Sequence, residues 1–316
     1  MSLIKFKKQT IPFKGAYLLL LIVFAFAMSL NVNAQLYKKS FWPKRYADKY
    51  EVFPDIIYKT VDTTTCKLDV YMPKNAKAVN PVLIFTHGGG WVKGSKDSIS
   101  IQLTPYLNAG WVVVNVGYRL IDRAPAPAAV EDTRCALAWV YENAAKFKID
   151  TNKIVLTGGS AGGHLALITG MIPLGTSLDK SCIQGHSMKV AAIVDFYGIV
   201  DVNDLLAGEN KKGYAVRWLA SQKDSVKIAA LVSPINYVRK GLPPIIRIQG
   251  DEDPTVPYSH SLRLKSALDA AGVPNSLYTV SKGLHGKFTK EEMADIYKKV
   301  SEFLKLNVGL DYDLAE

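Results

Sequence analysis

The sequence predicts an α/β protein with a mostly parallel central sheet covered by helices on both faces. Short apolar runs rich in Val and Ile recur along the chain, and segments with helical apolar spacing alternate with them. Continuously apolar runs are typical of parallel strands that are buried on both faces. No internal repeat or low-complexity linker interrupts this alternation, so we expect one large domain over residues 35–316.

The first 34 residues are expected to be a secretory signal peptide. A segment with four lysines precedes an uncharged run over residues 16–30, and Val32 and Ala34 stand at the two positions read for cleavage. The run is shorter than the roughly 20 residues of a spanning helix, which favours cleavage after Ala34 over an uncleaved anchor. The residues near this point include no cysteine, so a lipid anchor is not expected. The sequence thus predicts export, periplasmic or fully secreted, with no stable membrane anchor.

The charge of the chain indicates no nucleic-acid partner. Without the four lysines of the leader, the net charge falls from +11 to about +7. Such moderate basicity is compatible with acidic polysaccharide or membrane surfaces. No dense block of Lys and Arg and no nucleic-acid motif is present, so we expect an ordinary solvated basic surface.

The cysteines and metal-binding residue types offer no clear framework. Cys66, Cys135 and Cys182 are odd in number and lack CxxC spacing, so a disulfide framework is not indicated, although export permits one bridge. Cys135 lies on an apolar helical stripe and is expected to be a small core residue. No His/Cys/Asp cluster has metal-ligand spacing, and no metal or organic cofactor is expected.

The strands follow from apolar runs that end in turn signals. In chain order they are expected at residues 55–61, 66–72, 81–86, 111–116, 154–157, 190–194, 244–248 and 276–280. The first two are separated by the turn-rich residues 62–65, and those at 81–86 and 111–116 are continuous apolar runs. Ligands of such sheets bind at the carboxyl ends of the strands, where all the motifs below fall.

The helices follow from apolar stripes and end signals. They are expected at residues 97–109, 130–147, 164–169, 259–271 and 291–306. Leu137, Val140 and Tyr141 form one stripe of the second helix, and Gly272 is a good residue to end the fourth. Residues 201–237 break the alternation. They are either a small helical insert that caps the substrate pocket or an ordinary helical excursion on the surface.

The run Gly158-Gly-Ser-Ala-Gly-Gly163 has the context of a nucleophile elbow. It follows a β-prone apolar stretch and precedes an apolar stretch with helical spacing. The central Ser160 must occupy a sharp turn, and small neighbours allow the strand and the helix to approach closely. The alternative is a Gly-rich turn without chemistry, because Gly-x-Ser-x-Gly alone is a weak pattern.

The stretch His87-Gly-Gly-Gly-Trp91 follows another strand and can direct backbone N–H groups toward one point. Acyl transfer needs such donors because the carbonyl oxygen becomes an oxyanion as the nucleophile adds. We therefore expect Gly89 and Gly90, with Ala161 directly after the nucleophile, to form an oxyanion hole. Phosphate-binding Gly-rich patterns fit this stretch poorly.

A serine hydroxyl needs a base, and His285 is the candidate. It stands in the loop between the last strand and the last helix, as the order Ser, acid, His requires. The other histidines are expected to have other roles: His87 bracing the oxyanion loop, His164 packing below the elbow, His186 in a polar loop and His260 in the first turn of a helix.

The acid is expected in the turn that follows the strand 244–248. Asp253 is the first choice because Pro254 and Pro257 stiffen the loop beyond it. Asp251 is the near alternative and Asp201 a third. The acid fixes the tautomer of the imidazole and stabilises the imidazolium, and it does not take the proton itself.

These motifs together resemble the α/β-hydrolase family. More narrowly they are similar to its secreted esterase and lipase-like branch with a His-Gly-Gly-Gly loop, including the bacterial feruloyl/acetyl esterases. The resemblance covers roughly residues 56–306. It rests on residues 158–162, 87–96, 115–120 and 125–132, the pattern Gly250-x-x-Asp253-x-x-Val256-Pro257, and His285. The family's pattern favours Asp253 over Asp251.

The resemblance implies an α/β-hydrolase fold and ester hydrolysis through a Ser160, His285 and Asp253 triad. The expected substrates are short acyl or aromatic esters, with O-acetyl or feruloyl groups on plant polysaccharide first, by analogy with the family. An amide hydrolase or peptidase like the prolyl oligopeptidases could use the same triad. A non-catalytic binding protein that kept the fold is the third class.

Overall fold

The computed structural model describes residues 44–76, 79–98, 101–182, 185, 188–219 and 222–315. The predicted signal peptide and His186 lie outside these residues. Residues 44–316 form one compact unit.

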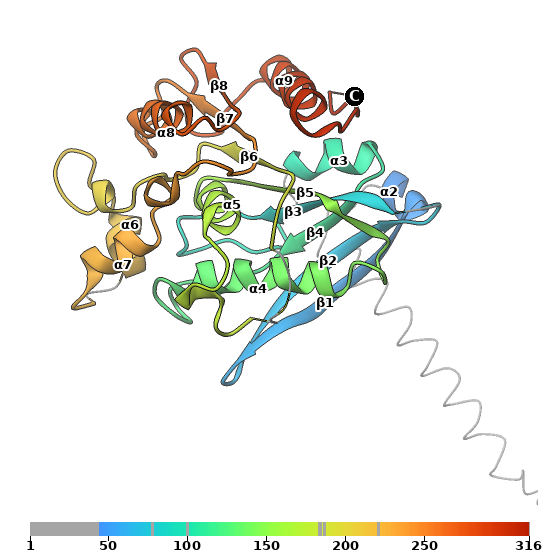
Figure 1. The fold of residues 1–316 in the computed structure, drawn as a ribbon, viewed down its shortest axis with the longest axis horizontal. Helices are drawn as coiled ribbons and strands as arrows, with labels where there is room; N and C mark the ends of the chain where they lie inside the picture. The colour runs from blue at the N-terminus through green and yellow to red at the C-terminus, as the bar shows by residue number, and fades with distance from the viewer. Residues whose placement is uncertain are drawn as a thin grey trace, which may run out of the picture. The chain divides into compact units, whose positions relative to one another are not determined.

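The described chain is built on one sheet of eight strands (Figure 1). The strands are β1 (Tyr50–Val61), β2 (Thr64–Pro73), β3 (Asn80–Thr86), β4 (Val112–Val116), β5 (Ile149–Gly159), β6 (Ala192–Phe196), β7 (Ile245–Gly250) and β8 (Asn275–Val280). Their order is β1-β2-β4-β3-β5-β6-β7-β8. β1 and β2 form an antiparallel hairpin, β2 pairs antiparallel with β4, and all later pairs are parallel.

Helices cover both faces of this sheet, as predicted. Outside residues 201–237 they are α2 (Lys44–Lys49), which precedes β1, α3 (Thr104–Asn108), α4 (Ala128–Glu142), α5 (Ala161–Met171), α8 (Ser259–Ala270) and α9 (Lys290–Val308). α4, α5 and α8 share one apolar core with the strands, whereas α3 and α9 lie on the opposite face (Figure 1). Tyr297 of α9 contacts Tyr106 of α3 there, at a ring-centroid distance of 6.3 Å.

The strands explain why apolar runs predict this sheet. The central β3 lies between β4 and β5, and Leu83 is in register with Val113 and Val155 on its two neighbours. All three side chains are fully buried. A strand covered by helices on both faces has no solvated side, so its sequence is apolar without alternation.

Two predicted helices are shorter in the structure. The one expected at 97–109 is reduced to a 3-10 turn, Ile101–Leu103, followed by α3. The one expected at 130–147 begins at Ala128 and ends at Glu142. At its end, the side-chain amide of Asn143 donates to the carbonyl of Trp139 over 2.9 Å, which offers that carbonyl a partner outside the helical ladder.

Residues 201–237 form a helical insert between β6 and β7. It consists of η3 (Asn203–Leu205), α6 (Gly213–Leu219), α7 (Ser225–Leu231) and η4 (Pro234–Tyr237). Trp218 of α6 is fully buried and stacks on Trp91, with ring centroids 4.0 Å apart and an interplanar angle of 12°. The insert therefore packs into a second apolar core and is not a loose excursion on the surface.

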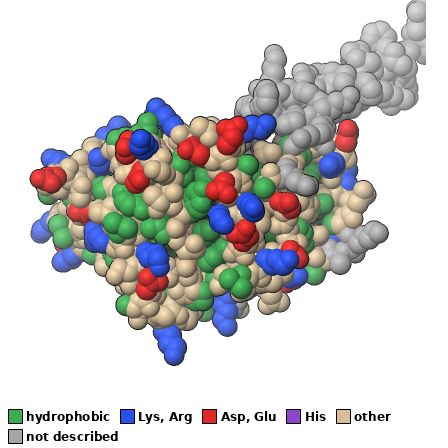
Figure 2. Space-filling view, turned by 90° about the horizontal axis from the view of Figure 1, so that it is seen from above, with side chains coloured by type: hydrophobic (Ala, Val, Ile, Leu, Met, Phe, Trp, Pro, Cys, Tyr) green, Lys and Arg blue, Asp and Glu red, His purple; other side chains and the backbone are tan. Residues whose placement is uncertain are grey.

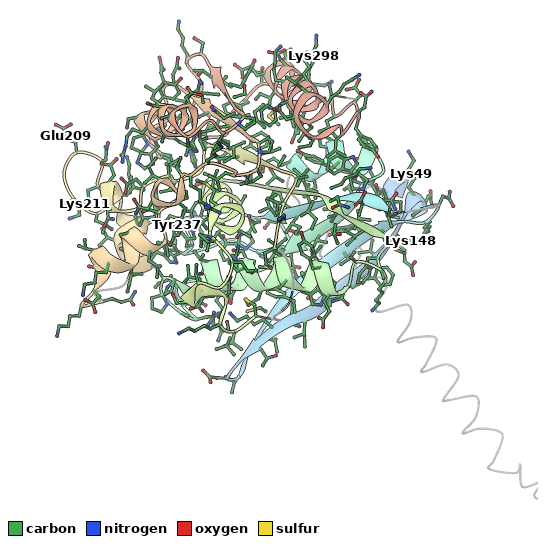
Figure 3. All side chains as sticks on the ribbon, in the orientation of Figure 1. Lys49, Lys148, Glu209, Lys211, Tyr237 and Lys298 are labelled. Atoms are coloured by element: carbon green, nitrogen blue, oxygen red, sulfur yellow. A yellow bond between two sulfur atoms is a disulfide. The ribbon has the colours of Figure 1, made fainter. Side chains whose placement is uncertain are left out.

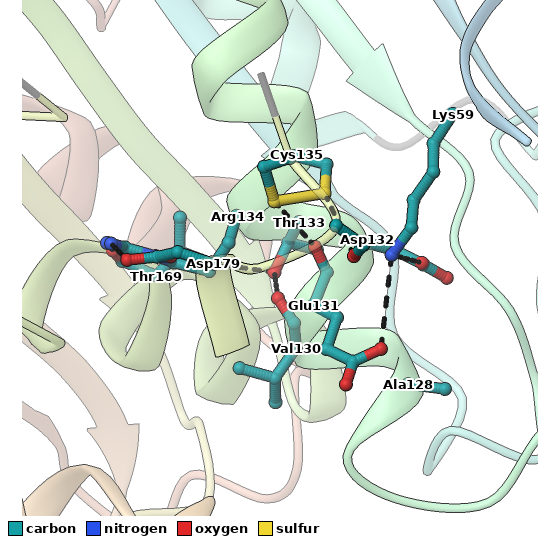
Figure 4. Close-up of a disulfide and its surroundings, with 12 residues drawn as sticks. Lys59, Ala128, Val130, Glu131, Asp132, Thr133, Arg134, Cys135, Thr169 and Asp179 are labelled. Carbon is teal, nitrogen blue, oxygen red and sulfur yellow. Dashed lines mark hydrogen bonds and ion pairs between the residues drawn. A yellow bond between two sulfur atoms is a disulfide. The ribbon is translucent and has the colours of Figure 1, made fainter. Parts of the chain in front are cut away.

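A disulfide joins Cys135 of α4 to Cys182, which follows the 3-10 turn η2 (Ser177–Asp179) (Figure 4). Cys135 is a buried core residue as predicted, and the structure forms the single bridge that the sequence left open. Beside it, the guanidinium of Arg134 binds both carboxylate oxygens of Asp179 at 2.6 and 2.7 Å. Cys66 is free and buried.

The surface of the described chain has mixed charge. Figure 2 shows Lys and Arg side chains interspersed with Asp and Glu on one face, without a large block of one sign. Within the described ranges, the helices are all too short or too polar to cross a lipid bilayer.

Candidate active site

Ser160 occupies a strained turn between β5 and α5. Its backbone has φ of 58° and ψ of −123°, a conformation that a residue with a β-carbon adopts only at a cost of about 1–3 kcal/mol. The N–H of Ser160 donates to the carbonyl of Phe196 over 2.9 Å, which ties the turn to the end of β6. The surrounding structure thus holds the serine in a conformation that points it away from the strand and the helix.

The glycines of the elbow are required by close packing against β3. A β-carbon at Gly158 would lie 2.4 Å from the carbonyl oxygen of Thr86, and one at Gly162 would lie 2.0 Å from the same oxygen. A β-carbon at Gly88 would lie 2.8 Å from the carbonyl oxygen of Gly159. No larger residue fits at these positions without displacement of the backbone, and this contact brings the Gly-rich loop to the elbow.

His285 and Asp253 form a hydrogen-bonded pair at the cavity that Ser160 lines. Nδ1 of His285 lies 2.8 Å from Oδ2 of Asp253. The Asp253 side chain is fully buried, and its Oδ1 accepts from the N–H groups of Thr255 (2.8 Å) and Val256 (3.0 Å). Burial acts to raise the pKa of Asp253, but the hydrogen bond and charge of His285 and these two N–H groups outweigh burial and lower the pKa. Asp253 is therefore held as a carboxylate.

The two alternative acids have structural partners elsewhere. Asp251 accepts from the backbone N–H of Lys282 over 2.6 Å, which holds the loop that carries His285. Asp201 pairs with the guanidinium of Arg263 at 2.5 Å. Of the three carboxylates considered from the sequence, Asp253 is the one bonded to His285.

The predicted oxyanion residues lie around the same serine. Gly89 and Gly90 line the cavity with Ser160, and both have positive φ, 120° and 62°. Ala161 is the first residue of α5. Among the backbone hydrogen bonds between described residues, none has the N–H group of Gly89, Gly90 or Ala161 as its donor. These three N–H groups are therefore candidates for binding an oxyanion.

The remaining described histidines are structural. His87 stacks on Tyr118 at a centroid distance of 4.3 Å, as expected for a residue that braces the loop. His164 accepts from the indole of Trp91 and lies 2.6 Å from the carbonyl of Val232, and burial lowers its pKa to about 4.

His260 differs from the expectation for a polar first helical turn. It is fully buried, and its Nε2 lies 2.9 Å from Asp204 of the insert. Its Nδ1 accepts from the N–H of Val200 over 3.2 Å. Helical position alone gave no sign of this burial, because the covering residues come from the segment after β6.

The cavity beside Ser160 has a volume of about 790 Å³. His285 and the oxyanion glycines form one part of its wall. Aromatic side chains from four segments form much of the rest: Phe85, Phe196, Tyr197, Tyr214 and Phe288. The cavity thus combines an apolar wall with the polar groups that acyl transfer requires.

The insert contributes directly to this wall. Tyr214 and Arg217 of α6 both line the cavity. The hydroxyl of Tyr214 donates to the carbonyl of Thr255 over 3.1 Å, and Nζ of Lys212 donates to the carbonyl of Pro254 over 2.9 Å. The start of α6 is therefore fixed to the loop that follows Asp253, and residues 201–237 shape the pocket as a cap does.

Gln249, which lies behind the acid, is not among the residues predicted from the sequence. Its Nε2 is 3.3 Å from Oδ2 of Asp253 and donates to the carbonyl of Val256 over 2.7 Å. Its Oε1 accepts from Arg247 (2.7 Å) and from the hydroxyl of Ser261. These two donors fix the orientation of the amide, so its N–H group faces Asp253. The only signal that the sequence offers is a glutamine in an apolar strand. The structure shows that this glutamine is fully buried, where a polar side chain needs hydrogen-bond partners.

The described residues contain no group of three or more His, Cys, Asp or Glu side chains arranged to hold a metal ion.

Comparison with known proteins places this geometry among esterases. A model of the BD-FAE family matches residues 68–268. Esterase LipQ of Mycobacterium tuberculosis is 30% identical over 241 residues, which cover 72% of this chain and 56% of that protein. Esterase LipC of the same organism is 31% identical over 196 residues, 60% of this chain and 49% of that protein. The chain thus spans about half the length of these curated relatives.

Solved structures match over nearly their whole length. The apo form of Thermogutta terrifontis esterase 2 has a TM-score of 0.68 and 30% identity, covering 81% of this chain and 94% of that one. A truncated carbohydrate esterase from gut microbiota has a TM-score of 0.67 and 28% identity, covering 80% and 97%.

Proposed function

Since this chain belongs to the BD-FAE family and has an α/β-hydrolase fold, we propose that it hydrolyses carboxylic esters through an acyl-enzyme on Ser160. The observation that carries the proposal is the bonded pair of His285 and Asp253 at the cavity of a strained serine, beside three N–H groups that donate to no backbone carbonyl of the described residues. This is the set of groups that acyl transfer needs: nucleophile, base, orienting acid and oxyanion donors.

The proposed reaction follows from the hydrogen bonds of His285. With Nδ1 donating its proton to Asp253, Nε2 has a free lone pair and can take the proton of Ser160 as its Oγ attacks the ester carbonyl. Asp253, kept ionised, stabilises the imidazolium. The N–H groups of Gly89, Gly90 and Ala161 bind the oxyanion. His285 then protonates the leaving alcohol, and the same steps with water release the acid.

For the substrate, we propose short acyl or aromatic esters, first of all O-acetyl or feruloyl groups on plant polysaccharide. The aromatic lining of the cavity supports an aromatic acyl group, because aromatic rings pack well against each other. One structural neighbour is a carbohydrate esterase from gut microbiota. Export through a signal peptide over residues 1–34 belongs to the same proposal, since it would give access to glycans. Sequencing the N-terminus of exported protein tests it, with Gln35 as the expected first residue.

The test compares Ser160→Ala with the wild type on an aryl acetate, acetylated xylan, feruloylated arabinoxylan and an aminoacyl arylamide. Ser160→Ala should keep its circular dichroism spectrum and lose turnover by a factor on the order of 10⁴ or more. Unchanged turnover would refute the role of Ser160. A preference for the arylamide would favour a peptidase over an esterase.

A further inference from the structure

The charged residues that line the cavity, histidines aside, are both cations. They are Lys93, which follows the oxyanion loop, and Arg217 of α6. None of the described Asp or Glu residues lines the cavity. A solvated protein surface carries charges of both signs, as Figure 2 shows elsewhere on this molecule. The wall of the cavity differs, because its described residues include two cationic side chains and no carboxylate.

Neither cation has a partner among the described residues. In the described ranges, most ion pairs join a Lys or Arg side chain to an Asp or Glu side chain. None of these pairs includes Lys93 or Arg217. Every Asp and Glu of the chain except Glu316 lies in those ranges. Neither positive charge therefore forms an ion pair with a carboxylate of the described residues.

Both cations are held beside the oxyanion glycines. A β-carbon at Gly89 would lie 3.3 Å from Cγ of Lys93, and one at Gly90 would lie 3.1 Å from Cβ of Tyr214. Arg217 is one helical turn after Tyr214 and so shares its side of α6. The stacking of Trp218 on Trp91 and the hydrogen bond from Tyr214 to Thr255 fix α6 in this place.

We propose that the preferred substrate is an ester that also carries a carboxylate, and that Lys93 and Arg217 bind this carboxylate. The inference rests on the proposed esterase function and narrows its substrate class. An acylated acidic sugar, with the carboxylate in the alcohol part, and a dicarboxylic acid monoester, with the carboxylate in the acyl part, share this chemistry. Arg suits the planar carboxylate because its N–H groups form a matching fork, and Lys adds a compact charge.

The size of the effect follows from the exposure of both side chains. Exposed ion pairs change an equilibrium by about two- to fivefold each, so the two cations together should favour the anionic ester by about 5- to 20-fold in kcat/KM. The preference should shrink between about 0.01 M and about 1 M salt, as the Debye length falls from about 30 Å to about 3 Å.

The experiment measures kcat/KM for two pairs of esters of similar shape, each with one anionic and one neutral member, relative to the rates of their spontaneous hydrolysis. 4-Acetoxybenzoate and 4-acetoxybenzamide place the charge on the alcohol side. The 4-nitrophenyl monoesters of adipic acid and of adipamic acid place it on the acyl side. Each pair is tested with the wild type, Lys93→Gln, Arg217→Gln and the double variant. Lys211→Gln is the matched control, because Lys211 lies in the same insert, outside the cavity wall, on the outer loop before α6 (Figure 3).

We expect the wild type to prefer the anionic member of at least one pair at low salt, and the pair identifies the side that carries the charge. The double variant should lose this preference, because its loss on the anionic ester exceeds its loss on the neutral one, and Lys211→Gln should behave as the wild type. Equal rates for both members of both pairs would overturn the inference. So would an equal loss on charged and neutral esters, which would mean that the cations act on the oxyanion and not on the substrate carboxylate.

A failure of the proposed esterase function can be distinguished from a failure of the inference about the carboxylate site. If the wild type hydrolysed none of the four esters, the esterase proposal would fall. Calorimetric binding of 4-acetoxybenzoate and 4-acetoxybenzamide to Ser160→Ala would then decide the inference. Tighter binding of the benzoate, lost on adding Lys93→Gln and Arg217→Gln, would support a carboxylate site, and equal binding would overturn it.

Discussion

Replacing Gln249 with Leu is expected to slow ester hydrolysis, although Gln249 does not line the cavity. The change removes the N–H group that lies 3.3 Å from Oδ2 of Asp253 and leaves that buried carboxylate with His285 and two backbone donors. Leu has nearly the same volume, so the packing of β7 should survive. Arg247 keeps Asp195 and the carbonyl of Gly198 as partners.

The magnitude follows from the length of the bond. Hydrogen bonds to a charged group contribute about 1.5–3 kcal/mol, and a bond of 3.3 Å belongs at the lower end. If Asp253 stabilises the imidazolium in the transition state, a loss of about 1.5 kcal/mol lowers kcat/KM by about tenfold. The assay is the hydrolysis of an aryl acetate, with urea unfolding as a check that the variant is folded.

Ser261→Ala is the matched control for this prediction. It removes a hydroxyl that contacts the other end of the same amide, at Oε1, and leaves the contact of Gln249 with Asp253 in place. We expect it to lower stability but to change kcat/KM by less than about twofold. An unchanged rate in folded Gln249→Leu, or an equal loss in Ser261→Ala, would refute the role given to Gln249.

Three further predictions concern other parts of the structure. Burial lowers the folded-state pKa of His164 to about 4, so the unfolded chain takes up a proton at this residue at a higher pH than the folded chain does. The contribution of His164 to the free energy of unfolding should therefore fall by on the order of 3 kcal/mol as the pH drops from about 6.5 to about 4. Urea unfolding of His164→Asn should lack this component. The unfolded chain should show one titratable thiol before reduction, that of Cys66, and three after reduction. The bridge should contribute about 2–4 kcal/mol to the free energy of unfolding. Three thiols without reductant would exclude the bridge. Asp253→Asn should lower kcat by on the order of 10⁴-fold and Asp251→Asn by less than about tenfold, and the reverse ranking would exchange the roles of the two carboxylates.

The parts of the site that the sequence predicts are those whose signals are local. Ser160 is recognisable because an elbow needs glycines on either side, and the structure places both under a carbonyl of β3. His285 follows from its place after the last strand. The preference for Asp253 over Asp251 follows from Pro254 and Pro257 and is supported by the family's pattern. Both carboxylates stand in one turn, and the geometry separates the residue that bonds to His285 from the one that holds the loop.

The parts that the sequence could not predict depend on contacts between distant segments. Arg217 lines the cavity, and Trp218 stacks on Trp91, only because the insert folds back over the oxyanion loop. The partner of Cys135 depends on the path of the chain after α5, for which no local pattern exists. His260 is polar and stands in the first turn of a helix, so its burial follows from the segment that covers it.

The most direct test of the central claim is covalent labelling of Ser160. The protein is incubated with diethyl 4-nitrophenyl phosphate, which reacts with an activated serine, and the adduct is located by peptide mass spectrometry. We predict one diethylphosphoryl group on the peptide that contains Ser160, none in Ser160→Ala, and much slower labelling in His285→Ala. An unlabelled wild type, or a label on a different residue, would contradict the assignment of Ser160 as the nucleophile.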